Sequence, residues 1–526
     1  MPSTRSTLGF KAPLFMKINF PFNYKNLFQS FIICSIIILI VACNGTKQDE
    51  SANTEGQPVV IGDTAIRIDN YLKKLETEEG FSGGLLIIKN GKKVFSKGYG
   101  WANKEKQIPF TTTSLACIGS ITKYFTATAF LKLCELDNKI SVNDSLRKFF
   151  PLVPSDKADI TIHQLLTHSS GFHEFLENDG GDYAKIETKD FLTSAFKEPL
   201  AFAPGTKAVY TNVGMSILAI ILEQVTGMSY ESFLQKYLFD SAGIKTMGYN
   251  YPVKNDSALA HGYDNGKDWG TLQSHYDAAG GGPYWNLKGN GGQYASLEDW
   301  YEWIVSVDEG KILNQSSLEK MFSPQIVEEG MDGKFSFGYG CNIYQSRRNT
   351  KAIDNGGSNG IYFARLLRLP EDGVVFYLVT NNNIMNANMV LPNVTQLFFD
   401  GEIKQDATQQ LRGFDSPKAE EIYNLLKEKG AADFENELSK AGITVDDDMI
   451  YLEAGQKLLE EKKADEAIAL YKVYTKQFPN IIVAWNDLGD AYVLKGEKEN
   501  AINCYRQALK LRPENPRAKE ALEKLK

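Results

Sequence analysis

Gly119-Ser120-Ile121-Thr122-Lys123 places a serine three residues before a lysine, at the start of an apolar helical run. Ser-x-x-Lys alone is weak evidence, because the chain contains it four times, with serines at 120, 145, 194 and 317. Only Ser120 follows an apolar segment and precedes a run of apolar residues with helical spacing. Its hydroxyl should therefore lie at a helix N-terminus, which favours negative charge, with Lys123 one turn along the same face. A lysine there can stabilise an alkoxide or, once desolvated, accept its proton, so we predict that Ser120 is a nucleophile and that Lys123 manages its proton.

A second motif, Tyr210-Thr211-Asn212, lies 90 residues beyond Ser120. It follows Ala203-Pro204-Gly205 and precedes an apolar run with helical spacing. Tyr-x-Asn also begins at Tyr24 and Tyr284, but these copies lie in the N-terminal segment and in a glycine-rich loop. A buried structural tyrosine is the default interpretation of Tyr210 alone, whereas its placement relative to Ser120 favours catalysis.

Together the two motifs resemble those of the serine β-lactamases and penicillin-binding proteins, particularly the branch of class C β-lactamases, D-alanyl-D-alanine carboxypeptidases and esterases. The stretches 160–171 and 289–299 are also similar to segments of this family, and the resemblance covers roughly residues 62–400. Within the second stretch, Ser296 is expected to cap a helix.

The resemblance assigns roles to the residues that match the motifs. It implies that Tyr210 is a general base, which relays the proton of Ser120 to the leaving group and whose phenol pKa is lowered by Lys123. It implies that Asn212 orients the substrate amide.

The third family motif is altered in Asp354-Asn355-Gly356-Gly357-Ser358-Asn359-Gly360. The family usually has Lys-Thr-Gly or His-x-Gly there, on a strand at the edge of the site, and either Asp354 or Asn355 could stand at the position of the cation. We predict that Asn355, Gly356 and Gly357 bind substrate, and that the N–H of Ser120 forms an oxyanion hole with an N–H of this strand. Without the cation, an ester or a neutral D-amino-acid peptide is as plausible a substrate as a β-lactam.

The pattern of strands and helices predicts an α/β fold. Residues 84–95 form a hairpin around Asn90-Gly91, and the strand-like runs 360–369 and 373–380 follow a largely helical middle. An early hairpin and a closing hairpin suit an antiparallel sheet flanked by helices, with a separate helical lobe. The predicted helices are 121–136, 162–167, 213–225 and 230–238.

The composition changes after about residue 404, and the rest of the chain is predicted to be helical. Residues 482–515 carry the tetratricopeptide pattern at Trp485, Leu488, Gly489, Tyr492, Ala501, Tyr505, Ala508 and Pro513, and a shift of 34 residues finds a similar unit at 448–481. We therefore predict a linker at 404–416 and an all-α repeat domain at 417–526. Its concave surface could bind a protein partner, or the helices could pack on the hydrolase as an appendage.

The N-terminal sequence predicts that the protein is exported from the cytoplasm. Lysines precede the apolar run 31–42, which is too short to span a bilayer and ends in Ile40-Val41-Ala42-Cys43. This ending resembles the lipobox of bacterial lipoproteins, in which the cysteine is lipidated; an ordinary signal with an incidental cysteine is the alternative. We expect a signal peptide at 1–43, a lipid anchor on Cys43, a polar tether at 44–61 and a hydrolase domain at 62–403. The protein would then be anchored in the bacterial cell envelope, at the outer membrane facing the periplasm or the surface.

The net charge argues against a nucleic-acid-binding protein, and the spacing of the histidines argues against a metal site. The formal charge of −8 gives no reason to expect nucleic acid as a partner. His163, His168 and His173 advance about 140° per step around a helix, so they share no face and predict no metal site or cofactor. We predict a serine hydrolase that acts through an acyl-enzyme on a small-molecule or peptide substrate, namely a β-lactam, a D-amino-acid peptide or a carboxylic ester. The alternatives are a catalytically weak sensor or scaffold and a metallohydrolase that uses the histidines.

Overall fold

The computed structural model describes residues 56–177, 180–249, 258–327, 335–404, 406–407, 417–445, 448–511 and 515–525. The predicted signal peptide 1–43, with Cys43, lies outside the described residues. So do most of the predicted tether 44–61 and most of the predicted linker 404–416.

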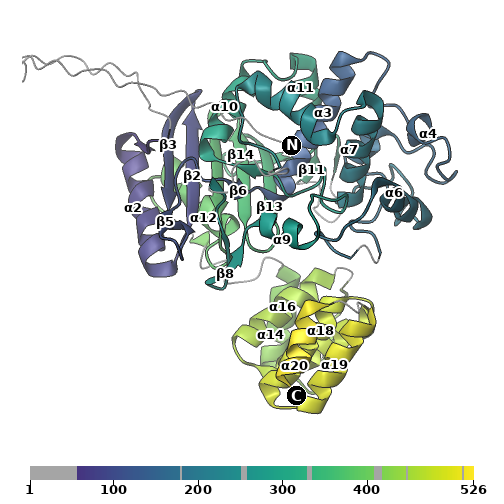
Figure 1. Ribbon diagram of the computed structural model, residues 1–526. Coiled ribbons are helices and arrows are strands. Elements are labelled where there is room, and N and C mark those ends of the chain that lie inside the picture. Colours follow the sequence, from purple (N-terminus) through teal and green to yellow (C-terminus); the bar gives the residue numbers. More distant parts are fainter. Residues whose placement is uncertain are drawn as a thin grey trace, which may run out of the picture. The chain divides into compact units, whose positions relative to one another are not determined.

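A nine-stranded antiparallel sheet is the centre of the N-terminal part of the chain. Its strands follow the order β1-β3-β2-β15-β14-β13-β12-β11-β10, so strands from the two ends of this part lie side by side (Figure 1). The bounds are β1 (Val59–Val60), β2 (Gly83–Lys89), β3 (Lys92–Tyr99), β10 (Ile326–Val327), β11 (Phe335–Phe337), β12 (Asn342–Gln345), β13 (Lys351–Ser358), β14 (Phe363–Leu369) and β15 (Val374–Thr380). Three two-stranded sheets add β4 (Trp101–Asn103) with β5 (Ile108–Pro109), β6 (Ala116–Cys117) with β9 (Tyr294–Ala295), and β7 (Gly262–Asp264) with β8 (Lys267–Gly270).

The two predicted hairpins supply the central strands. Asn90 and Gly91 join β2 to β3 with φ of 49° and 75°, a left-handed conformation that these residue types tolerate. β14 pairs with β15, and β15 pairs with β2 from Thr380 opposite Gly83 to Val374 opposite Lys89. The first hairpin is therefore closed into one sheet by the last.

Helices surround this sheet, as predicted. They are α2 (Gly62–Glu79), α3 (Thr122–Leu136), α4 (Leu146–Phe149), α5 (Ile162–Leu166), α6 (Thr188–Lys197), α7 (Asn212–Thr226), α8 (Tyr230–Leu234), α9 (Leu272–Ala278), α10 (Leu297–Asp308), α11 (Gln315–Met321) and α12 (Ala387–Phe399). Short helical turns are η3 (Gly119–Ile121), η4 (Gln235–Phe239) and η5 (Asp240–Ala242). The predicted helix 230–238 is wrong in one respect, because α8 ends at Leu234 and continues as the wider π-helical turn η4.

Each face of the sheet packs against its own helices because successive side chains of a strand alternate. Leu85 and Ile87 of β2 share a core with α2 and α12, whereas Leu86 and Ile88 share the opposite core with α3 and α10. Ser296 caps α10 as predicted, since its hydroxyl accepts a hydrogen bond from a backbone N–H of the first turn. The α/β sandwich predicted from the sequence is thus confirmed.

The C-terminal part is all-α and has a hydrophobic core of its own (Figure 1). Its helices are α14 (Pro417–Lys429), α15 (Phe434–Lys440), α16 (Asp448–Glu460), α17 (Ala464–Gln477), α18 (Ile482–Lys495), α19 (Lys498–Leu511) and α20 (Pro516–Lys524). The helix pairs α16–α17 and α18–α19 occupy the two predicted repeats. Gly455 lies against the ring of Tyr471 and Gly489 against the ring of Tyr505, so a small residue on one helix admits the aromatic of the next.

Among the described helices, none alone is long and apolar enough to span a bilayer. One bent pair, Asn212–Thr226 with Tyr230–Ala242, passes that test by length and composition.

Candidate active site

Ser120 lies on η3, a single turn that joins β6 to the first residue of α3. Gly119 precedes it with φ of 51°, in the left-handed region that favours glycine. A Cβ on Gly119 would lie 2.5 Å from the backbone nitrogen of Ser358, so a larger residue does not fit. The local sequence therefore folds into a tight turn that places the Ser120 hydroxyl at the start of α3, where it was predicted.

Lys123 lies one turn beyond Ser120 and contacts it directly. The Lys123 Nζ donates hydrogen bonds to the Ser120 Oγ at 3.0 Å and to the backbone carbonyl of Asn290 at 2.7 Å. The side chain of Asn290 is held in turn by the Ser216 hydroxyl and by the carbonyl of Asn286, both at 2.9 Å. Lys123 is only 3% exposed, and this burial lowers its pKa to about 7. A large fraction of Lys123 is therefore neutral near pH 7 and able to accept the proton of Ser120.

Tyr210 completes a cluster of three polar side chains. Its ring centroid lies 4.7 Å from the Lys123 Nζ, and its phenol lies near enough to Ser120 for that hydroxyl to affect its pKa. Burial raises the pKa of Tyr210 well above its ordinary value. The prediction that Lys123 lowers this pKa is therefore wrong, because the loss of water disfavours the phenolate more than its neighbours stabilise it. Tyr210 stays protonated, and the basic group beside Ser120 is Lys123.

The ring of His168 packs against the ring of Tyr210. Its ring centroid lies 4.8 Å from that of Tyr210, and its Nδ1 accepts a hydrogen bond from the backbone N–H of Thr211 at 3.2 Å. Burial lowers the pKa of His168 to about 3, so the imidazole is neutral. This histidine therefore holds the backbone of Thr211, the residue that follows Tyr210, in place.

Asn212 begins α7 and lines the same cavity as Ser120. Its backbone N–H donates to the carbonyl of Glu174 at 3.0 Å. Its side chain is 8% exposed, and its Oδ1 has no hydrogen-bond partner among the described residues. A buried acceptor without a partner costs free energy, so this oxygen is the part of Asn212 that a donor group would stabilise.

The strand that carries the altered third motif, β13, runs directly beside η3. Asp354 binds the guanidinium of Arg365, whose other side reaches Asn388 of α12, so Asp354 belongs to the sheet face opposite α3. Asn355 points to the α3 face, where its Nδ2 donates to the carbonyl of Gly340 at 2.6 Å. Asn355 therefore stands at the cation position, and its amide donor is engaged by the protein.

The backbones of β13 and η3 approach so closely that only glycine fits between them. A Cβ on Gly357 would collide with the carbonyl of Ile118 and lie 2.9 Å from the nitrogen of Ser120. The next residue, Ser358, brings its nitrogen beside Gly119. The backbone nitrogens of Ser120 and Ser358 thus both lie at the contact between η3 and β13.

The cavity in front of Ser120 has a volume of about 130 Å³. Ser120, Tyr210 and Asn212 line it, as predicted, with Lys123 directly behind Ser120. The predicted substrate-binding residues Asn355, Gly356 and Gly357 are not among the lining residues; the two positions that follow them, Ser358 and Asn359, line the cavity instead.

Two carboxylates at this cavity were not predicted from the sequence. Glu174 and Asp182 both line it, Glu174 exposed and Asp182 half-buried. Neighbouring protein displaces water and raises the pKa of Glu174, while Lys123 opposes that shift. Glu174 lies three residues beyond the family-like stretch 160–171. Extending that stretch by a few residues would have identified Glu174 as a candidate site residue.

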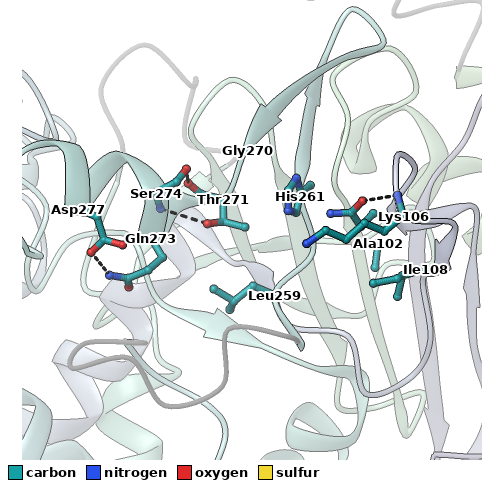
Figure 2. A pocket seen from close by; sticks show the side chains of 11 residues that line it. Ala102, Lys106, Ile108, Leu259, His261, Gly270, Thr271, Gln273, Ser274 and Asp277 are labelled. Carbon is teal, nitrogen blue, oxygen red and sulfur yellow. Dashed lines mark hydrogen bonds between the residues drawn. The ribbon is translucent and has the colours of Figure 1, made fainter.

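A larger cavity of about 510 Å³ lies between the β4–β5 hairpin, residues 259–261 and the start of α9, and holds none of the predicted catalytic residues (Figure 2). His261 lines it and bonds Asp268 at 2.9 Å; these two and Glu105 are the described residues whose geometry could hold a metal ion. The structure does not bring the histidines weighed in the sequence analysis together into a metal site. The Nδ1 of His163 bonds the hydroxyl of Tyr339 at 2.8 Å, and the Nδ1 of His168 faces Thr211.

Comparison with protein families gives two matches. The Beta-lactamase model matches residues 68–396, and a TPR repeat model matches residues 489–522. The first match contains every described residue of the site.

Two of the relatives are similar over about half of the chain. One is "Putative penicillin-binding protein PbpX" of Bacillus subtilis (strain 168), 30% identical over 258 residues, which are 49% of this chain and 62% of that protein. Another is teichoic acid D-alanine hydrolase of Staphylococcus aureus (strain MRSA252), 27% identical over 265 residues, which are 50% of this chain and 59% of that protein. The chain therefore spans less than two thirds of the length of these relatives.

A solved structure with the same architecture is the octameric penicillin-binding protein homologue from Pyrococcus abyssi. It superposes with a TM-score of 0.57 at 25% identity, over 68% of this chain and 81% of that one.

Proposed function

The chain belongs to the Beta-lactamase family, and we propose that it is a serine hydrolase that forms an acyl-enzyme through Ser120 on an ester or an amide. One observation carries the proposal: the Lys123 Nζ lies 3.0 Å from the Ser120 Oγ in a site that lowers the pKa of Lys123 to about 7. A buried lysine that is partly neutral near pH 7 is a base suited to activating a serine hydroxyl.

Each residue has a step in the proposed reaction. Neutral Lys123 accepts the hydroxyl proton as the Ser120 Oγ bonds to the carbonyl carbon of the substrate. The carbonyl oxygen becomes negative and receives the N–H groups of Ser120 and Ser358. Tyr210 is protonated and gives its proton to the leaving oxygen or nitrogen as that bond breaks, and Lys123 returns the proton to Tyr210. Water then attacks the acyl-enzyme by the same route, releasing the acid and restoring Ser120.

The finer specificity is also part of the proposal. Class C β-lactamases and D-alanyl-D-alanine carboxypeptidases use a cation of the third motif to bind a substrate carboxylate, and this chain has Asn355 there, with its donor engaged by Gly340. This supports a carboxylic ester or a D-aminoacyl compound over a β-lactam. The relative named teichoic acid D-alanine hydrolase agrees with such an acyl donor.

Purified protein that lacks residues 1–43 tests the proposal with a p-nitrophenyl ester and with nitrocefin. Hydrolysis of the ester that is lost in Ser120→Ala supports it. Absence of turnover on esters, β-lactams and D-amino-acid peptides would contradict it and favour the sensor or scaffold instead.

The lipid anchor and the repeat partner are separate proposals. The lipobox-like ending at Cys43 supports attachment to the bacterial cell envelope by a lipidated cysteine. Metabolic labelling with an alkyne fatty acid should mark the full-length protein and not Cys43→Ala. The match to a TPR repeat model supports a protein partner at the C-terminal helices, which pull-down with the full chain and with a chain ending at residue 416 would test.

A further inference from the structure

A further cavity lies on the face of the sheet opposite Ser120. Its volume is about 290 Å³, and residues of β12, β13, β14 and α12 line it. Ala352 of β13 and Leu391 of α12 line this cavity and belong to the core that the sheet shares with α2 and α12. Ile121 of η3 and Tyr124 of α3 belong to the core on the other face. A ligand in this cavity would therefore occupy a site separate from the catalytic one.

One wall of the cavity is apolar. β14 contributes Leu367 and Leu369 to it, and α12 contributes Leu391, Pro392 and Phe399. The three leucines are at most 8% exposed, so they lie at the inner end of the cavity. Each methylene group of a ligand that is buried against such a wall raises the affinity by about fourfold.

Arginines line the outer side of the same cavity. Arg347 and Arg348, in the turn between β12 and β13, are exposed, and Arg365 of β14 is half-buried. A guanidinium stays protonated in proteins, so all three side chains are positively charged. Asp400 also lines the cavity, and its carboxylate lies 3.5 Å from the ammonium of Lys404. Positive groups therefore outnumber the acidic one among the residues that line the cavity.

Two of these arginines have hydrogen-bond donors to spare. The Arg348 Nε donates to Asp372 at 3.0 Å, and the guanidinium carbon of Arg348 lies 4.4 Å from the centroid of the Phe399 ring. The two terminal nitrogens of Arg348 have no hydrogen-bond partner among the described residues. The Arg347 side chain has neither a hydrogen bond nor an ion pair within the part of the chain that the structure describes. Arg348 and Arg365 are each matched by an aspartate, so the charge of Arg347 is the one left over.

We propose that this cavity binds an amphipathic carboxylate, that is, a fatty acid of medium chain length. The planar guanidinium of Arg347 or Arg348 presents paired N–H donors that match the two oxygens of a carboxylate. The alkyl chain lies against the leucines of β14 and α12. The cavity volume corresponds to roughly ten water molecules at about 30 Å³ each, so a chain of about ten carbons fills it. The binding is not covalent, and it does not depend on the proposed function, because Ser120 lies across the sheet.

A series of ligands separates chain length from charge. Isothermal titration calorimetry is carried out on protein lacking residues 1–43 with hexanoate, octanoate, decanoate and dodecanoate, each below the concentration at which it forms micelles. We expect the association constant to rise about fourfold per methylene group and to level off beyond about ten carbons. 1-Octanol keeps the chain of octanoate without its charge and should bind about tenfold more weakly, and octylammonium should bind more weakly still.

Variants of the lining residues test the location. Arg347→Gln and Arg348→Gln together remove two charges at exposed positions and should weaken the binding of decanoate by about tenfold. Thr395→Phe adds a ring to the α12 side of the cavity, so the affinity should level off at a shorter chain. Arg506→Gln removes the charge of an exposed arginine of α19 and is the matched control, which should bind decanoate as the wild type does.

Three results would overturn the inference. 1-Octanol that binds as tightly as octanoate shows that the arginines do not receive the ligand. An affinity that does not rise from hexanoate to decanoate shows that the apolar wall does not hold a chain. Unchanged binding of decanoate both in the double arginine variant and in Thr395→Phe, with native circular dichroism, places the carboxylate elsewhere on the protein. Hydrolysis of an ester that is lost in Ser120→Ala can accompany any of these results, so the failure of this inference is distinguishable from the failure of the proposed function.

Discussion

Replacement of Lys123 by methionine tests whether burial in the site lowers the pKa of the Lys123 ammonium. Burial lowers the pKa of Lys123 from its ordinary value of 10.5 to about 7. The unfolded chain therefore binds more protons than the folded one between pH 7 and 10.5, and stability rises with pH in that window. Integrated from pH 6 to pH 9, the shift corresponds to about 3 kcal/mol of stability gained by the wild type. Lys123→Met has no such group and should not gain it.

The measurement is urea unfolding at pH 6 and pH 9, followed by the fluorescence of tryptophans such as Trp300 and Trp303, which pack against α3. Relative to the wild type, Lys123→Met should lose about 3 kcal/mol between the two pH values. The loss of the hydrogen bond to the Asn290 carbonyl adds a cost at both pH values and cancels in the difference. Lys132→Met, on the same helix but paired with Glu135, controls for the loss of any lysine of α3. A difference between wild type and Lys123→Met that is the same at pH 6 and pH 9 would refute the reasoning.

Three further outcomes follow from the same structure. The kcat/KM for a neutral ester should rise with pH and level off above about 7, as Lys123 loses its proton; a profile that is flat from about pH 5 to 9 contradicts its role as base. Gly357→Ala should abolish ester hydrolysis while circular dichroism stays native, because the added methyl collides with the carbonyl of Ile118 at the wall of the oxyanion hole; wild-type kcat/KM would show that this contact does not matter. Gly489→Ala should lower the stability of the repeat unit by about 1–3 kcal/mol, since the methyl would lie 2.6 Å from the ring of Tyr505, and a thermal scan that shows an unchanged or higher Tm contradicts this.

Local sequence patterns predicted much of the fold. The hairpin around Asn90-Gly91 and the run after Ser120 follow from spacing and turn chemistry, which depend on neighbours in the chain. The repeat pattern around Gly489 is of the same kind, because a small residue must face a large one at a fixed interval. These features were predictable since each is decided within a few dozen residues.

The electrostatics of the site could not be predicted in this way. The pKa of Tyr210 depends on how completely the folded chain removes water from it, and this burial raises the pKa more than the neighbouring Ser120 lowers it. The direction in which the Asn355 side chain points depends on Gly340, which lies in the turn between β11 and β12. Glu174 and Asp182 reach the cavity through loop geometry, and no periodic pattern marks them.

The most direct test of the account is covalent labelling of the native protein with a fluorophosphonate, followed by proteolysis and mass spectrometry of the labelled peptide. The account predicts one labelled site, at Ser120, with labelling that is lost in Ser120→Ala and slowed in Lys123→Met. Labelling at any other serine, or labelling that persists in Ser120→Ala, would contradict it.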